Sequence, residues 1–257
     1  MDVDELLKRY QCGERDFSGK SFRHIKLRGL VLPKINLSNT DLNCADLSAT
    51  DLTEANLTEA NLEKTNFSDA KLTQANFSQV KAMYTNFTRA DLSRSNLNPA
   101  KLSNVKFTRA NLTQIDWSGG NLKKADLSGI TLIEANLSQA ILSEANLTGA
   151  NLTKANLRGA NLRGSHLQQA NLTQAILTEA NLAGTNLDQT NLQEAKLIRA
   201  NLGGANINKT SFQNADLSWA RLRGINTTLA ALKQAKAILT GAELPNGTIY
   251  QEDTEVK

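Results

Sequence analysis

Residues 145–154 read ANLTGANLTK, two copies of a pentad made of a small residue, a polar residue, leucine and two turn-forming residues. The same register runs from Phe17 to Leu222, where every fifth residue is Leu, Phe, Ile or Trp, with Ala82 as the one exception. A period of five fits neither an α-helix nor a straight strand, because both would send successive leucines to different faces. Each pentad must therefore turn a corner that returns the next leucine to a common axis, which predicts a solenoid.

The residues of one pentad divide into an interior pair and a corner. Ala145 and Leu147 are two positions apart, so they point to the same side of an extended segment, while Asn146 points away. Thr148 and Gly149 are left to form the corner, where Asn, Asp, Ser, Thr and Gly are favoured. Each pentad is thus expected to supply one wall and one corner of the solenoid.

Residues that depart from the common pattern recur every twenty positions, and this spacing gives the size of one coil. Two sets share it: Phe67, Phe87 and Phe107 in place of leucine, and Gly164, Gly184, Gly204 and Gly224 at one corner. Residues twenty apart are expected to stack in neighbouring coils, so four pentads make one four-sided turn. The sequence therefore predicts an all-β, quadrilateral solenoid of about ten coils with short helical caps.

The pentads 55–59 (ANLTE) and 150–154 (ANLTK) resemble those of the pentapeptide-repeat family, and the resemblance covers most of the chain. It implies that the β-solenoid is right-handed. The entry stretch, residues 6–10 followed by residues 13–17, is similar to the N-terminal lead of cyanobacterial members of this family.

The unbroken register predicts one elongated domain with a cap at each end. Residues 1–16 are expected to form an N-terminal helical cap, since apolar residues at helical spacing follow Asp2 and Asp4, either of which can serve as N-cap. The solenoid is expected over residues 17–224. Residues 225–257 are expected to hold a second short helix within 228–236, two out-of-phase repeats, a turn at 245–247 and a disordered tail from Gln251.

Composition and motif content argue against several classes of protein. The chain has no apolar run long enough to cross a bilayer and no signal peptide, which predicts a cytoplasmic protein. Cys12 and Cys44 are too few for a disulfide framework and lack metal-ligand spacing. His24 and His166 fall in distant coils, so neither a catalytic triad nor a histidine-rich metal site is expected. We expect no enzyme activity and no cofactor.

The formal charge of +4 is concentrated on the side of the solenoid that is centred on Phe22, Leu42 and every twentieth residue after them. Met83 and Tyr84 occupy outward corner positions on this side, and exposed Met and aromatic residues are favoured at interfaces. The residues predicted to bind a partner are Lys64, Lys81, Met83, Tyr84, Lys101, Lys123 and Lys124. The alternatives are that the basic residues only keep the protein soluble, and that Met83 and Tyr84 fold over Ala82 to fill the space of its missing side chain.

These features favour a monomeric, non-enzymatic scaffold or regulator that presents flat solenoid faces to a protein partner. The family resemblance also implies nucleic-acid mimicry that modulates a topoisomerase, which a pI of about 9.0 opposes. The basic side could instead bind nucleic acid directly, but Tyr84 is its one aromatic residue for stacking, so we expect no nucleic-acid partner. A rank of threonines at twenty-residue spacing, interrupted by Pro33, Ile133 and Gln193, makes ice or ordered-water binding a minor alternative.

Overall fold

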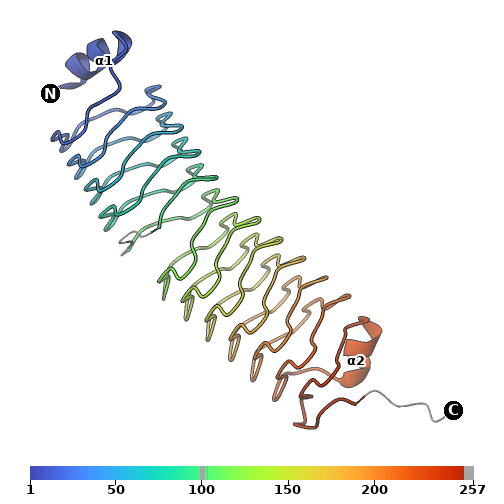
Figure 1. Ribbon diagram of the computed structural model, residues 1–257. Helices are drawn as coiled ribbons and strands as arrows, with labels where there is room; N and C mark the ends of the chain where they lie inside the picture. Colours follow the sequence, from blue (N-terminus) through green and yellow to red (C-terminus); the bar gives the residue numbers. More distant parts are fainter. Residues whose placement is uncertain (99–101, 103, 252–257) are drawn as a thin grey trace. The chain divides into compact units, whose positions relative to one another are not determined.

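The computed structural model describes residues 1–98, 102 and 104–251 as two compact units. Unit 1 comprises Met1–Trp117 and Asp126–Leu132, and unit 2 comprises Ser118–Ala125 and Ile133–Lys257. Each unit is a stack of coils, with helix α1 (Val3–Gln11) at one end of unit 1 and helix α2 (Leu229–Gln234) near the end of unit 2 (Figure 1). The sequence predicts one domain with boundaries after residues 16 and 224, and those boundaries stay predictions.

Neighbouring coils are joined by parallel bridges between residues twenty positions apart. Asn56, for example, is bridged to Asn76. The Leu57 amide donates to the Asn76 carbonyl at 2.8 Å, and the Asn76 amide donates to the Ala55 carbonyl at 2.9 Å. The same pairing recurs along both units, and the described part of the solenoid contains no helix. The predicted coil of four pentads is confirmed.

Many of the described corners are tight turns held by an Asn or Asp side chain of the same pentad. The Ala60 amide donates to the Leu57 carbonyl at 3.0 Å, and Glu59 has φ 60°, which is the pattern of a type II turn. The Asn56 Oδ1 atom accepts a hydrogen bond from the Thr58 amide at 3.1 Å. Asn and Asp are therefore favoured at this position because their side chains bind the corner backbone, a reason that the repeat pattern alone did not give.

The interior of unit 1 contains a column of stacked aromatic rings. The ring centroids of Phe67 and Phe87 lie 5.1 Å apart and those of Phe87 and Phe107 lie 5.3 Å apart, with nearly parallel planes. Trp117 is buried and meets Phe107 edge to face. Phenylalanines that are twenty residues apart in the sequence thus contact one another in neighbouring coils.

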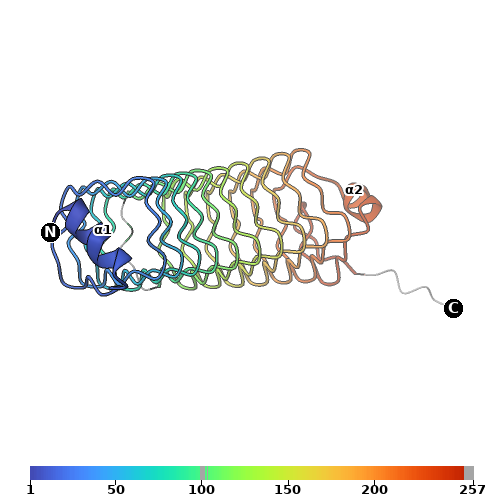
Figure 2. The same ribbon diagram turned by 90° about the horizontal axis from the view of Figure 1, so that it is seen from above.

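Helix α1 covers the first coil of unit 1, across which it lies in Figure 2. The side chain of Asp2 accepts a hydrogen bond from the Glu5 amide, so of the two expected N-caps it is Asp2 that serves. Leu6 is fully buried, and the Tyr10 hydroxyl donates to the Pro33 carbonyl at 2.7 Å. Helix α1 lies within residues 1–16, the range in which the sequence predicts a helical cap.

Helix α2 interrupts the coil pattern of unit 2, and two repeats then follow out of phase. Asp216 is bridged to Ile238 and Arg221 to Glu243, so two residues more than one regular coil separate the partners. After the turn at 245–247, Ile249 pairs with Glu243 in an antiparallel bridge. Residues 252–257, which hold most of the predicted disordered tail, lie outside the described residues.

Candidate functional site

Met83 and Tyr84 project from a corner of unit 1 whose interior residues are buried. Val80 and Ala82 are inaccessible to solvent, whereas Met83 is 42% exposed and Tyr84 is 52% exposed. The larger Val80 side chain supplies apolar volume beside the small Ala82. The exposure of the two large side chains favours a role at the surface over a role as filling for the space above Ala82.

Two lysines lie beside this apolar pair in unit 1. The Lys64 amide donates to the Met83 carbonyl at 2.9 Å. The corner that holds Lys64 therefore lies one coil before the corner that holds Tyr84, and the two are neighbours. Lys81 is bridged to Asn61 in that same coil. In the part of the chain that the structure describes, neither Lys64 nor Lys81 has an ion-pair partner. We call Lys64, Lys81, Met83 and Tyr84 the Tyr84 surface.

The backbone at Tyr84 lies in a region that bulky residues avoid. Its φ is 58°, a left-handed conformation that costs roughly 1–2 kcal/mol for a residue with a Cβ atom. Most corners with positive φ hold Gly, Gln, Glu, Lys, Arg or Asn. Tyr84 and Trp219 are the only Tyr, Trp or Phe residues with positive φ among those described. Neither aromatic side chain is needed to make the turn.

The Tyr84 surface is defined within unit 1 and leaves out three of the predicted contact residues. Lys101 lies outside the described residues. Lys123 and Lys124 belong to unit 2, where their ammonium groups lie 4.0 Å and 3.3 Å from the carboxylate of Glu144. Glu144 follows Lys124 by one coil, so their attraction is a consequence of the stacking. Of the predicted contact residues, the Tyr84 surface therefore contains the four that the structure describes in unit 1.

Unit 2 has an exposed apolar cluster that the sequence analysis missed. Trp219 is 58% exposed and Ile238 is 50% exposed. The sequence could have indicated this cluster, because Trp219 occupies the second corner position of its pentad, from which a side chain points outward. The place of Ile238 beside Asp216 depends on the two-residue phase shift around α2, which the repeat pattern does not fix.

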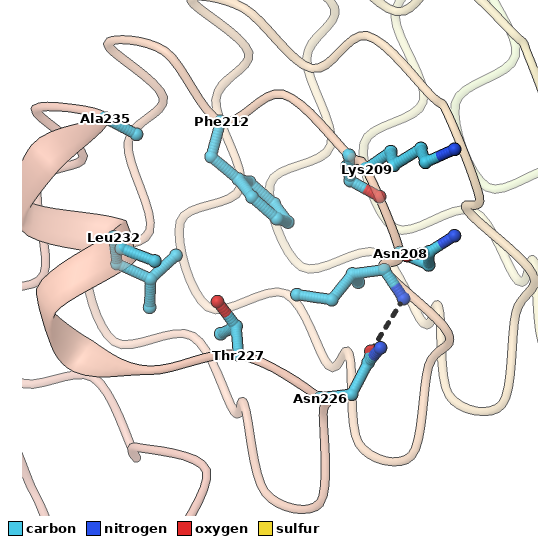
Figure 3. A pocket seen from close by; sticks show the side chains of 10 residues that line it. Asn208, Lys209, Phe212, Asn226, Thr227, Leu232 and Ala235 are labelled. Atoms are coloured by element: carbon cyan, nitrogen blue, oxygen red, sulfur yellow. Dashed lines mark hydrogen bonds between the residues drawn. The ribbon is translucent and has the colours of Figure 1, made fainter.

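A cavity of about 230 Å³ lies between helix α2 and the last regular coil of unit 2 (Figure 3). Phe212 and Leu232 supply apolar walls, and the Asn226 Oδ1 atom accepts the Ile207 amide at 3.1 Å. In the regular coils a backbone carbonyl accepts the corresponding amide. The cavity therefore marks the place where α2 replaces a coil. Its lining holds no Asp, Glu, His or Cys, and Lys209 is the one titratable residue among the lining residues.

Most carboxyl groups with shifted pKa values bind the backbone of turns or pair with basic residues at the surface. Hydrogen bonds from Ser48 hold the pKa of Asp46 below its usual value, and the Arg89 guanidinium does the same for Asp69. Across the described residues, no three His, Cys, Asp or Glu side chains are placed to hold a metal ion. The same residues contain no helix that is long and apolar enough to cross a membrane.

Family models match the chain over most of its length. The model for pentapeptide repeats matches with eight copies, and the matched residues include 21–58, 34–69, 121–159, 130–169, 155–193 and 185–224. A second model, for a pentapeptide repeat region, matches residues 60–137. The chain belongs to the pentapeptide repeat family.

Solved structures include several similar pentapeptide repeat proteins. HetL, a protein involved in heterocyst differentiation regulation from the cyanobacterium Nostoc, is 28% identical, with 97% of this chain and all of HetL covered and a TM-score of 0.54. Full-length QnrB1, a plasmid-mediated fluoroquinolone resistance protein, is 15% identical over 86% of this chain and 95% of its own, with a TM-score of 0.31. Rfr23 from the cyanobacterium Cyanothece is 25% identical over 71% of this chain and 93% of its own, with a TM-score of 0.21.

The match to HetL and the family models confirm the right-handed quadrilateral β-solenoid and the resemblance to cyanobacterial members. A comparison with curated proteins gives no significant match.

Proposed function

We propose that this protein is a non-enzymatic scaffold or regulator that binds a protein partner through the Tyr84 surface. The observation that carries the proposal is the pair of half-exposed apolar side chains, Met83 and Tyr84, at a corner where the positive φ shared by the other corners disfavours a bulky residue. Sites that break local rules without a gain in folding are candidates for function. The cytoplasmic location and the monomeric state stay predictions.

The composition of the Tyr84 surface suits recognition of a protein. Burial of an apolar side chain of this size contributes about 1.5–3 kcal/mol relative to leaving it in water. Lys64 and Lys81 form a charged rim beside Met83 and Tyr84, and a tyrosine ringed by polar groups is a common arrangement of an interface hot spot. The involvement of HetL in the regulation of differentiation agrees with a regulatory role for a relative of similar length.

The other functions considered from the sequence receive less support. The positive net charge opposes mimicry of nucleic acid, and the pairing of Lys123 and Lys124 with Glu144 weakens the case for a continuous phosphate-binding track. Ordered-water binding would require free threonine hydroxyls. The Thr173 hydroxyl instead donates to Asn171 at 2.6 Å and accepts a hydrogen bond from Asn191 at 3.0 Å.

Capture of partners from a lysate of the source organism tests the proposal. Wild-type protein is compared with a Lys81→Ala/Tyr84→Ala double variant and with Gln79→Ala, which alters a corner of another face in the same coil. We expect at least one protein to be retained by wild type and by Gln79→Ala but lost from the double variant. Equal retention by all three proteins would contradict the proposed surface.

A further inference from the structure

The indole of Trp219 is held against the backbone of the coil that follows it. The Trp219 amide donates to the Thr240 carbonyl at 2.8 Å, which places Gly241 beside the Trp219 corner. A Cβ atom built on Gly241 would lie 2.5 Å from Cε3 and 2.6 Å from Cζ3 of the indole. The glycine backbone therefore supports one side of the ring while more than half of the side chain stays exposed.

The fold does not need an aromatic side chain at this corner. Gln139 in unit 2 occupies the equivalent corner, and its amide group likewise lies against a glycine of the next coil, Gly159. Gln139 and Trp219 have the same left-handed backbone conformation, with φ 59° and 60°, and this conformation disfavours bulky residues. A polar side chain can cover a glycine corner, so the exposed tryptophan calls for an explanation other than packing.

Further apolar and basic side chains lie around Trp219 in unit 2. Parallel bridges join Lys196 to Asp216 and Asp216 to Ile238, which places the half-exposed Ile238 on the same side as Trp219. The Arg199 amide donates to the Ser218 carbonyl at 2.9 Å, so the Arg199 corner directly precedes the Trp219 corner. We call Lys196, Arg199, Trp219 and Ile238 the Trp219 surface.

The charges of the Trp219 surface are not balanced within the described residues. Lys196 and Arg199 are exposed and have no ion-pair partner there. The carboxylate of Glu179 lies 3.5 Å from the Arg158 guanidinium, and one oxygen of Asp216 accepts the Ser218 amide at 3.0 Å. Lys196 and Arg199 are thus two cations without an ion-pair partner, and the nearby carboxylate of Asp216 is already bound to the amide of a turn. The surface favours a ligand that carries acidic groups.

We propose that the Trp219 surface is a second protein-binding site, and that it binds a partner segment with an apolar side chain flanked by carboxylates. The apolar side chain would lie on the exposed part of the indole and against Ile238. An acidic neighbour would accept charge-assisted hydrogen bonds from Arg199. Tryptophan and arginine are enriched among residues that dominate binding energy. This site goes beyond the proposed function, because with the Tyr84 surface it gives each unit its own binding site and makes the chain bivalent.

A random peptide display library is the probe that tests this proposal. Selection on the full chain carrying Tyr84→Ala avoids peptides that bind the Tyr84 surface. Binding of the selected peptides is then measured on variants at Trp219 and Arg199 and on Gln139→Ala, a control at an equivalent corner. We expect a class of peptides that combine Asp or Glu with a large apolar residue. Their affinity falls about tenfold or more for Trp219→Ala and Arg199→Glu and is unchanged for Gln139→Ala.

A second readout separates binding at the site from loss of folding. Trp117 is only 3% exposed, so a change in the emission of the folded protein on peptide addition reports mainly on Trp219. We expect a blue shift of the Trp219 emission on peptide addition, and we expect Trp219→Phe to retain part of the affinity because it keeps an aromatic ring. The proposal is overturned if no selected peptide depends on Trp219, or if the dependent peptides carry no excess of acidic residues. It is also overturned if light scattering shows that Trp219 drives association of two copies of this chain.

Discussion

The hydroxyl of Tyr10 donates a hydrogen bond to the carbonyl oxygen of Pro33 at 2.7 Å and thereby ties helix α1 to the first coil of unit 1. In later coils an amide of the preceding coil binds the corresponding carbonyl, as the Lys34 amide binds Thr53. A first coil has no such neighbour, so the cap supplies a donor in its place. Repeat proteins need a cap of this kind to shield the end of the stack.

Replacement of Tyr10 by Phe tests the role of this hydrogen bond. The substitution leaves the Pro33 carbonyl without its partner, and we expect the free energy of unfolding of unit 1 to fall by about 1 kcal/mol. Hydrogen exchange of the first-coil amides, together with denaturant unfolding, measures the effect. The matched control is Tyr84→Phe, which removes a hydroxyl from an exposed ring. A loss of equal size in both variants would show that the Tyr10 bond has no special role.

The phenylalanine column predicts a large loss of stability when its central ring is removed. Phe87 stacks on Phe67 and Phe107 and meets Phe77 edge to face at 5.7 Å. We expect Phe87→Ala to lower the free energy of unfolding by about 3–5 kcal/mol, because it creates a cavity and removes ring contacts. Phe87→Leu, which restores the usual pentad residue, is expected to lose less. Equal losses in thermal or denaturant unfolding would argue that the stacked rings add nothing beyond leucine packing.

The Asp46 carboxyl predicts a dependence of stability on pH. Hydrogen bonds from Ser48, from its hydroxyl and its amide, lower the pKa of Asp46 in the folded state, against an opposing effect of burial. A carboxyl with a lowered folded pKa stabilises the protein above its unfolded pKa, near 4, and this stabilisation is lost as the pH falls through the folded value. We therefore expect wild type to lose stability below about pH 4 more steeply than Asp46→Asn.

Asparagine is a fair replacement at this position because Asn66 and Asn86 occupy it in the next two coils. Its Oδ1 atom can still accept the Ser48 amide, so the turn is retained while the titration is removed. Denaturant unfolding of both proteins between neutral and acidic pH measures the difference. Parallel curves for the two proteins would show that Asp46 does not contribute to acid sensitivity.

The sequence predicts the solenoid well because its pattern and its contacts share one period. Residues such as Phe67 and Phe87 are twenty apart in the chain and therefore touch in space. The same period places Glu144 beside Lys124, twenty residues earlier, but a count of net charge on one side does not show which charges pair. The Trp219 surface was missed for a further reason. Its support by Gly241 depends on the two-residue shift that helix α2 introduces, and no periodic rule contains that shift.

Replacement of Tyr84 by Gly distinguishes a contact residue from a packing residue. Glycine adopts a positive φ without the steric cost that Tyr84 has at φ 58°, and the lost ring is half exposed. We expect the free energy of unfolding to stay within about 1 kcal/mol of wild type, since relief of strain offsets lost contacts. Binding of a captured partner is expected to weaken by about 1–2 kcal/mol or more, because the ring lies at the centre of the proposed surface. Calorimetric melting and titration of the partner measure the two quantities on the same preparation.

The alternative function of Tyr84 predicts the reverse outcome for the same variant. If the ring mainly shields the small Ala82 side chain, its removal should expose buried Val80 and lower the melting temperature while the affinity for the partner hardly changes. Met83→Ala adds a second test, because Met83 has an adjacent exposed side chain and a different place in the turn. A loss of stability without a loss of binding in both variants would assign these residues to packing and remove the basis of the Tyr84 surface.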